Sequence, residues 1–127
     1  MLYKRSGRLQ DAHTVFASNY DLIKDNPKAV HEYAQTKQRL AASLSNKDMP
    51  TKQRLTKDAV ELLRRAIQLS NDNIRNAWCY FDLAKALTWL QVPATEVTQA
   101  YDKAIELLPD EPRFQDSYQA WRQSRTN

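Results

Sequence analysis

Two neighbouring stretches with regularly spaced apolar and small residues constrain the fold of this chain most strongly. In the first, residues 80–87, an aromatic residue precedes a Leu and a small residue: Tyr80, Leu83 and Ala84. In the second, a β-branched residue, an aromatic and an Ala recur at spacings of four and three before a Pro: Val97, Tyr101, Ala104 and Pro109. Such spacings place the residues on one face of a helix. The two stretches therefore predict a pair of helices whose small residues meet in close contact.

This order of residue types resembles the tetratricopeptide repeat, in which an aromatic, a Leu and a small residue are followed by Ala, an aromatic and Pro. The resemblance implies an all-α fold, with antiparallel helix pairs stacked in a right-handed superhelix. It also implies a non-catalytic scaffold that binds a protein or peptide partner in a concave groove. An alternative is that the module packs against other domains of the same parent protein.

The repeat pattern divides the 127 residues into four parts of a single domain, 1–127. Residues 72–109 form the clear repeat, and residues 28–71 form a longer one, with a first helix from Lys28 to about Leu44. The second helix of the long repeat carries the same small and large residues: Ala59, Leu63, Ala66 and Leu69. Equivalent alanines Ala66 and Ala104 lie 38 residues apart, whereas the family period is about 34. We place the extra length in a loop at residues 45–50 and in a long helix from about Thr51.

The N-terminal part, residues 1–27, resembles a partial repeat. A turn at Gly7 and a second helix containing Ala12 and Phe16 are expected, but little remains of the first helix. We therefore expect the chain to begin inside a repeat of a longer protein. The apolar side of residues 9–23 should be poorly covered, and self-association through this end is expected.

The C-terminal part, residues 110–125, is expected to be a capping helix. Its start is marked by Pro112 with acidic residues beside it, which suits a helix N-terminus. Three aromatic residues then share one face at spacings of four and three: Phe114, Tyr118 and Trp121. A helix of this kind covers the open end of a repeat array.

Composition argues against an enzyme. The only histidines, His13 and His31, lie in different repeats without other ligands at metal-binding spacing, and one Gly cannot form a phosphate-binding loop. No metal or cofactor is therefore expected. The single cysteine, Cys79, excludes an internal disulfide and is expected to be a buried small hydrophobe. No apolar run approaches the roughly 20 residues that span a bilayer, and we expect a cytoplasmic protein without a membrane segment.

The candidate binding groove follows from the polar faces of the two first helices. On residues 74–90 a stripe with two Trp lies beside the apolar face, and the same offsets on residues 28–44 give cations and amides. By the resemblance, these residues line the groove: Lys28, His31, Gln35, Gln38, Arg39, Trp78, Phe81, Asp82, Lys85 and Trp89. The alternative for Trp78 and Trp89 is packing against the terminal helix or a neighbouring long side chain.

A second function class is contact with nucleic acid or another polyanion. The net charge is +4, and a set of basic residues lies on and just before the helix expected from about Thr51: Lys47, Lys52, Arg54, Lys57, Arg64 and Arg65. Acidic residues share this helix and the basic ones do not all face one way, so a nucleic-acid partner is not expected. True footprints concentrate charge on one face.

Overall fold

The computed structural model describes residues 2–126, and their secondary structure is helical without a strand. The helices are α1 (Leu2–Ser18), α2 (Tyr20–Ile23), α3 (Pro27–Ser43), the 3₁₀ helix η1 (Asn46–Asp48), α4 (Met49–Leu69), α5 (Asn73–Trp89), α6 (Ala94–Leu107) and α7 (Pro112–Thr126). The predicted all-α class is confirmed. The finer prediction of a right-handed superhelix stays a prediction.

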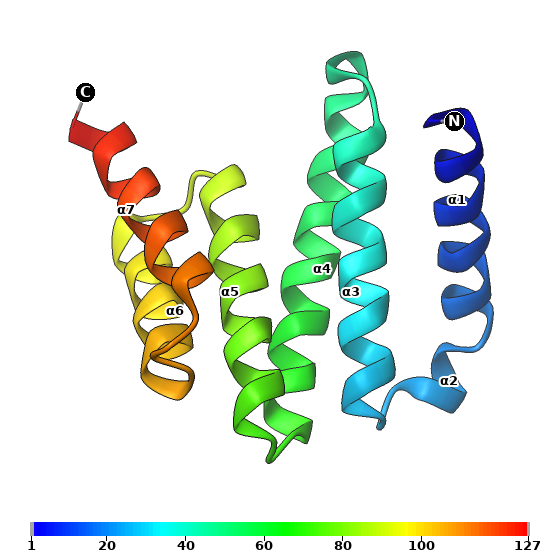
Figure 1. The fold of residues 1–127 in the computed structure, drawn as a ribbon. Helices are drawn as coiled ribbons and strands as arrows, with labels where there is room; N and C mark the ends of the chain where they lie inside the picture. Colours follow the sequence, from blue (N-terminus) through cyan, green and yellow to red (C-terminus); the bar gives the residue numbers. More distant parts are fainter. Residues whose placement is uncertain (1, 127) are drawn as a thin grey trace.

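The long helices stand side by side in a row and alternate in direction, with α1 and α7 at opposite ends (Figure 1). The closest neighbours are α3 with α4 and α5 with α6, and α4 joins the two pairs by packing on α5. At the ends of the row, α1 packs on α3 and α7 packs on α6. Helix α3 also reaches α5. This last contact brings the two predicted first helices together.

Local signals explain where the long helices begin. Asn26 caps α3, with its side chain accepting a hydrogen bond from the Ala29 N–H, and Pro27 occupies the first turn. Asp72 caps α5 by accepting from the Ile74 and Arg75 N–H groups. These caps satisfy N–H groups that have no partner within a helix. Both helix starts are therefore set by residues adjacent in sequence.

The end of α5 is closed by a left-handed residue. Gln91 has a φ of 60°, and its N–H donates to the Thr88 carbonyl while the Val92 N–H donates to the Leu87 carbonyl. This pair of bonds is the Schellman arrangement, which usually has Gly at the left-handed position. The turn carries the chain directly from α5 into α6.

Four alanines lie at the centre of the helix contacts, as the repeat pattern predicts. Ala34, Ala66, Ala84 and Ala104 are each 0% exposed. They belong to one hydrophobic cluster that continues from α3 to Phe114 of α7. Because Ala has no side chain beyond Cβ, it allows neighbouring helices to approach closely without strain. The predicted burial of these four alanines is thus confirmed.

One predicted feature of the chain path is wrong, and a second differs only in its boundary. Gly7 does not form a turn, since it lies inside α1, which ends only at Ser18 and is separated from α2 by Asn19. The loop predicted at residues 45–50 is shorter, because η1 occupies 46–48 and α4 already begins at Met49. Gly7 is tolerated inside α1 because helical hydrogen bonding along the segment outweighs one unfavourable residue. Pro50 lies in the first turn of α4, where a missing N–H costs no helical hydrogen bond.

The N-terminal end is less well covered than the rest, as predicted. No described side chain of α1 or α2 is fully buried, and Leu22 is 82% exposed. The main contact of α1 with α3 is a stack of Phe16 on Tyr33, with ring centroids 5.3 Å apart. At the other end Phe114 is completely buried. Phe114 of α7 is therefore buried more completely than any described side chain of α1.

Candidate functional site

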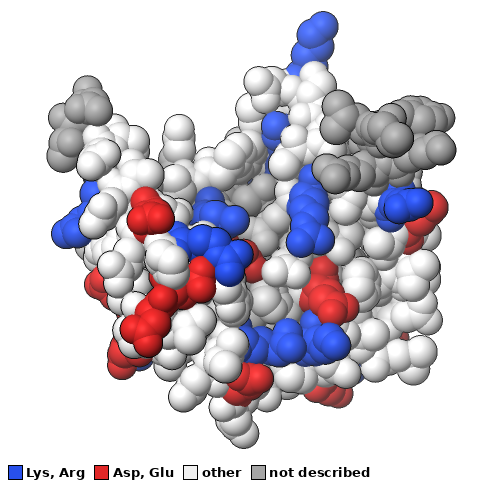
Figure 2. Space-filling view, in the orientation of Figure 1, with Lys and Arg blue, Asp and Glu red and all other residues white. Residues whose placement is uncertain are grey.

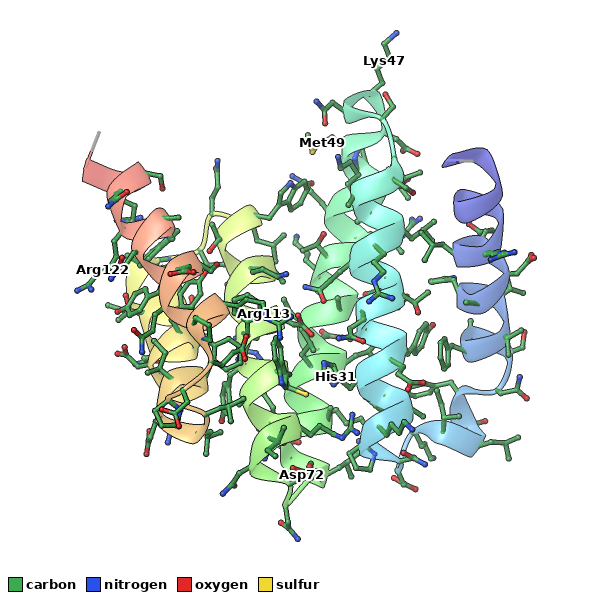
Figure 3. The ribbon with its side chains drawn as sticks, in the orientation of Figure 1. His31, Lys47, Met49, Asp72, Arg113 and Arg122 are labelled. Carbon is green, nitrogen blue, oxygen red and sulfur yellow. The ribbon has the colours of Figure 1, made fainter. Side chains whose placement is uncertain are left out.

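Asp82 of α5 is the polar centre of the contact between α3 and α5. Its Oδ2 lies 2.8 Å from His31 Nε2 and accepts a hydrogen bond from Gln35 Nε2 at 3.1 Å. The Gln38 amide donates to the Asp82 backbone carbonyl at 3.0 Å. His31, labelled in Figure 3, is also approached at its Nδ1 by the Arg75 guanidinium, at 3.5 Å. A buried carboxylate needs such donors to replace water.

Beside Asp82 an open cavity of about 550 Å³ lies between α3, α4 and α5, called here the α3–α5 cavity. Its lining comprises Gln35, Gln38, Arg39, Ala41, Ala42, Lys52, Thr56, Asp82, Lys85, Ala86 and Trp89. Six of these residues belong to the predicted groove: Gln35, Gln38, Arg39, Asp82, Lys85 and Trp89. Figure 2 shows this face hollowed between α3 and α5, with basic side chains on both sides. Its volume lies within the usual range of ligand pockets, roughly 300–1,000 Å³.

The cations of the cavity differ in how they are held. Lys52 is buried, and its Nζ donates to the Leu44 carbonyl and to Asn46 Oδ1, each at 3.3 Å. Lys85 is exposed, and its Nζ lies 4.8 Å from the centroid of the Phe81 ring. Arg39 is exposed and forms no ion pair or hydrogen bond with any residue that the structure describes. The two rim cations, Arg39 and Lys85, are therefore available to a ligand.

The two predicted Trp anchors occupy different environments. Trp89 lines the cavity and is 40% exposed. Trp78 instead meets Phe114 of α7 edge to face at 4.8 Å, and the Arg113 guanidinium lies 4.5 Å above its ring. Figure 3 shows Arg113 near the start of α7, facing α5. For Trp78, the contact with the terminal helix corresponds to the alternative that the sequence left open.

The remaining predicted groove residues lie apart from the cavity. Phe81 is buried, with its ring centroid 4.9 Å from that of Phe114. Lys28 is exposed on the first turn of α3 and does not contribute to the cavity lining. His31 is buried against Asp82. The helical stripe thus divides between an open cavity and the α5–α7 contact.

Sequence reasoning missed how α4 contributes to this site. Lys52 and Thr56 enter the cavity from the first turns of α4, and Ala41, Ala42 and Ala86 provide its small walls. A signal was present, because Lys52 and Thr56 are four residues apart and share one helix face. Their direction toward α5 nevertheless depends on how α4 crosses α5.

The basic residues of α4 do not gather on one surface. Lys52 lies in the α3–α5 cavity, whereas Arg64 faces Glu96 at 3.8 Å beside a separate cavity between α4 and α6. Arg65 donates to the Lys24 carbonyl at 2.6 Å and to Asp25 at 2.8 Å, on the α2 side. Arg54 and Lys57 are exposed. Of the five cations on α4, three therefore point toward different neighbours and two are exposed.

The described residues give little support for a metal site, a reactive thiol or a membrane-spanning helix. Residues 2–126 contain no group of three His, Cys, Asp or Glu side chains placed to share a metal ion. Cys79 is 0% exposed, and burial raises the pKa of its thiol to about 12. Within the same range, no helix has both the length and the apolar character required to cross a bilayer.

Comparison of the chain with protein-family models, curated proteins and solved structures found no match.

Proposed function

We propose that this chain is a protein-interaction module of the tetratricopeptide type, which receives an extended segment of a partner protein in the α3–α5 cavity. The observation that carries the proposal is that six residues predicted from two separate helices line one cavity of about 550 Å³. An exposed Trp beside amides and cations is the composition expected of a binding hot spot. The module would be cytoplasmic and non-catalytic, in line with its single buried thiol.

A polyanion-binding function is the second candidate, and the positions of the basic residues disfavour it. Binding to a nucleic-acid backbone requires several cations that follow one surface. On α4 one basic side chain points to the cavity, one to Glu96 and one to Asp25. The structure favours a cavity that holds a short segment over a surface that follows a long strand.

The test uses random linear peptides in a display library, selected on the purified protein, with the selected peptides then measured by fluorescence anisotropy. Replacing Trp89 with Ala should weaken their binding by about 2 kcal/mol or more, as for buried aromatic anchors. Ile74→Ala is the matched control, because Ile74 is an exposed apolar residue of the same helix outside the cavity. Trp78→Ala should chiefly lower stability, because this ring contacts Phe114.

Two outcomes would contradict the proposal. One is failure of the library to yield any peptide that binds the folded protein. The other is equal binding of the selected peptides to Trp89→Ala and wild type. Tight binding of a single-stranded DNA oligonucleotide with a steep salt dependence, lost in Arg54→Gln and Arg64→Gln, would favour the polyanion function instead.

A further inference from the structure

Resting on the proposed function, we propose that the α3–α5 cavity selects a peptide segment carrying two acidic side chains next to a large apolar residue. Three cations line the cavity, one from each helix: Arg39, Lys52 and Lys85. The single carboxylate among the lining residues is Asp82. The lining therefore carries two more positive than negative charges.

The internal carboxylate cannot neutralise the cations at the rim. Asp82 is 8% exposed, and its Oδ2 already meets His31 and Gln35. Neither Arg39 nor Lys85 has a charged partner among the described residues, and Lys85 Nζ lies over the face of the Phe81 ring. A ligand carboxylate at either rim cation would form a charge-assisted hydrogen bond, which is stronger than a neutral one.

Lys52 supplies a cation that is already positioned. Its Nζ is fixed by the Leu44 carbonyl and Asn46 Oδ1, and the residue is 8% exposed. A fixed cation loses little conformational entropy when a ligand binds, whereas a free Lys side chain loses more. The cavity therefore combines one preorganised positive charge with two adaptable ones at its rim.

The amides of the cavity favour a peptide over a phosphodiester backbone. Gln35 and Gln38 both use their Nε2 atoms inside the protein, toward Asp82. No described group donates to the Oε1 atom of either side chain. These oxygens can accept hydrogen bonds from the N–H groups of an extended peptide. Phosphodiesters present acceptors only, so such amide oxygens would remain unpaired beside them.

The apolar part of the lining explains the large apolar residue of the ligand. Trp89 is 40% exposed and lines the cavity together with three alanines, Ala41 and Ala42 of α3 and Ala86 of α5. An exposed indole ring beside small apolar residues provides an apolar surface on which a large apolar side chain of the ligand can be desolvated. Two acidic side chains beside this apolar residue of the ligand would neutralise the two excess positive charges of the cavity lining, whereas a single terminal carboxylate would neutralise only one.

The experiment compares peptides selected from a C-terminally amidated random library on three proteins: wild type, Arg39→Gln/Lys85→Gln and Arg54→Gln/Lys57→Gln. The last variant is the matched control, because it removes the same charge from exposed residues outside the cavity. Wild type should enrich Asp and Glu over Asn and Gln beside an apolar residue. Each Glu→Gln change in a selected peptide should weaken binding about tenfold, as expected for a hydrogen bond between charged groups.

The first double variant should bind the wild-type peptides at least about tenfold more weakly, while the control remains within about twofold, since distant surface charges are screened. Circular dichroism checks that all three proteins are folded. Selected peptides without acidic enrichment, but still dependent on Trp89, would overturn this inference and leave the proposed function intact. Undiminished binding of a selected peptide whose acidic side chains are replaced by amides while its C-terminal carboxylate is free, or preference for a single-stranded DNA oligonucleotide, would also overturn it. Absence of any selected peptide would overturn the proposed function as well.

Discussion

At the scale of single residues, Asp82 shows how one carboxylate can organise a helix contact. The sequence predicts it at the edge of a binding stripe, and the structure buries it between α3 and α5 with His31 and Gln35 as partners. A buried carboxylate is tolerated because its hydrogen bonds replace those to water. The hydrogen bond to Asp82 also holds Gln35, which lines the cavity. Asp82 therefore positions lining residues from beneath the surface.

Cys79 gives a prediction at the same scale. The residue is 0% exposed, and burial raises the pKa of its thiol to about 12, with a smaller contribution from the charge of Asp82. Since the thiolate is the reactive form, iodoacetamide at pH 8 should label the native protein very slowly and the urea-unfolded protein rapidly. Mass spectrometry measures both rates, with Cys79→Ser as the unlabelled background. Labelling of native protein at the rate of a free thiol would contradict the burial.

At the scale of elements, α1 is held on α3 by a small polar cluster as well as by Phe16. Lys37 Nζ donates to His13 Nε2 at 3.0 Å, lies 4.8 Å from the centroid of the Tyr33 ring, and is 3.6 Å from Asp58 of α4. Lys37 itself is only 7% exposed. The hydrogen bond requires His13 Nε2 to be unprotonated. Docking of α1 should therefore respond to pH.

The direction of this response follows from the pKa of His13. Burial and then the charge of Lys37 lower that pKa below 6.5, whereas Asp58 raises it less. As pH falls through 6.5, His13 becomes protonated in the unfolded state while it stays neutral in the folded state. The free energy of unfolding therefore decreases until the pH passes the lower pKa of His13 in the folded state. Wild type should lose more unfolding free energy than His13→Gln between pH 7 and pH 5.5. Urea titrations of both proteins measure this, and parallel pH profiles would exclude His13 as the cause.

At the scale of the whole molecule, the helix pairs α3–α4 and α5–α6 differ in length, but each completely buries two alanines of the repeat pattern. Ala34 and Ala84 occupy equivalent positions on α3 and α5, and Ala66 and Ala104 occupy equivalent positions on α4 and α6. All four are 0% exposed despite the unequal repeat length. Extra residues are absorbed at η1 and in the first turns of α4. The length difference thus changes one end of a helix pair and leaves its central contact intact.

This register predicts the effect of larger side chains. Ala84→Leu or Ala104→Leu should lower the free energy of unfolding by about 1–3 kcal/mol, because added methyl groups overpack a filled helix contact. Ala120→Leu on the exposed side of α7 is the control and should change stability by less than about 0.5 kcal/mol. Urea unfolding measures all three. An unchanged free energy of unfolding in both core variants would show that the helix contact at these positions is not tightly packed.

Much of the fold could be predicted because its signals are local. The first helix of the long repeat is predicted from Lys28 to about Leu44 and observed as Pro27–Ser43. Its cap, its 3.6-residue period and its buried alanine all lie within one segment. The wrong turn at Gly7 has a local cause too, since one Gly is a weaker signal than the helix-forming residues around it.

The sequence by itself therefore determined the helical elements, their approximate limits and the small residues at which they meet, because hydrogen bonding and periodicity act along the chain. Only the tertiary structure decided which of the predicted groove residues line the cavity and which pack against other helices. The Trp78 ring contacts Phe114 of α7, whereas Trp89 lines the cavity, although both residues lie on α5. His31 forms a hydrogen bond with Asp82, which lies fifty-one positions later in the sequence. Such choices depend on how helices cross and which side chains then meet, and the period of one helix carries no information about its neighbour's rotation.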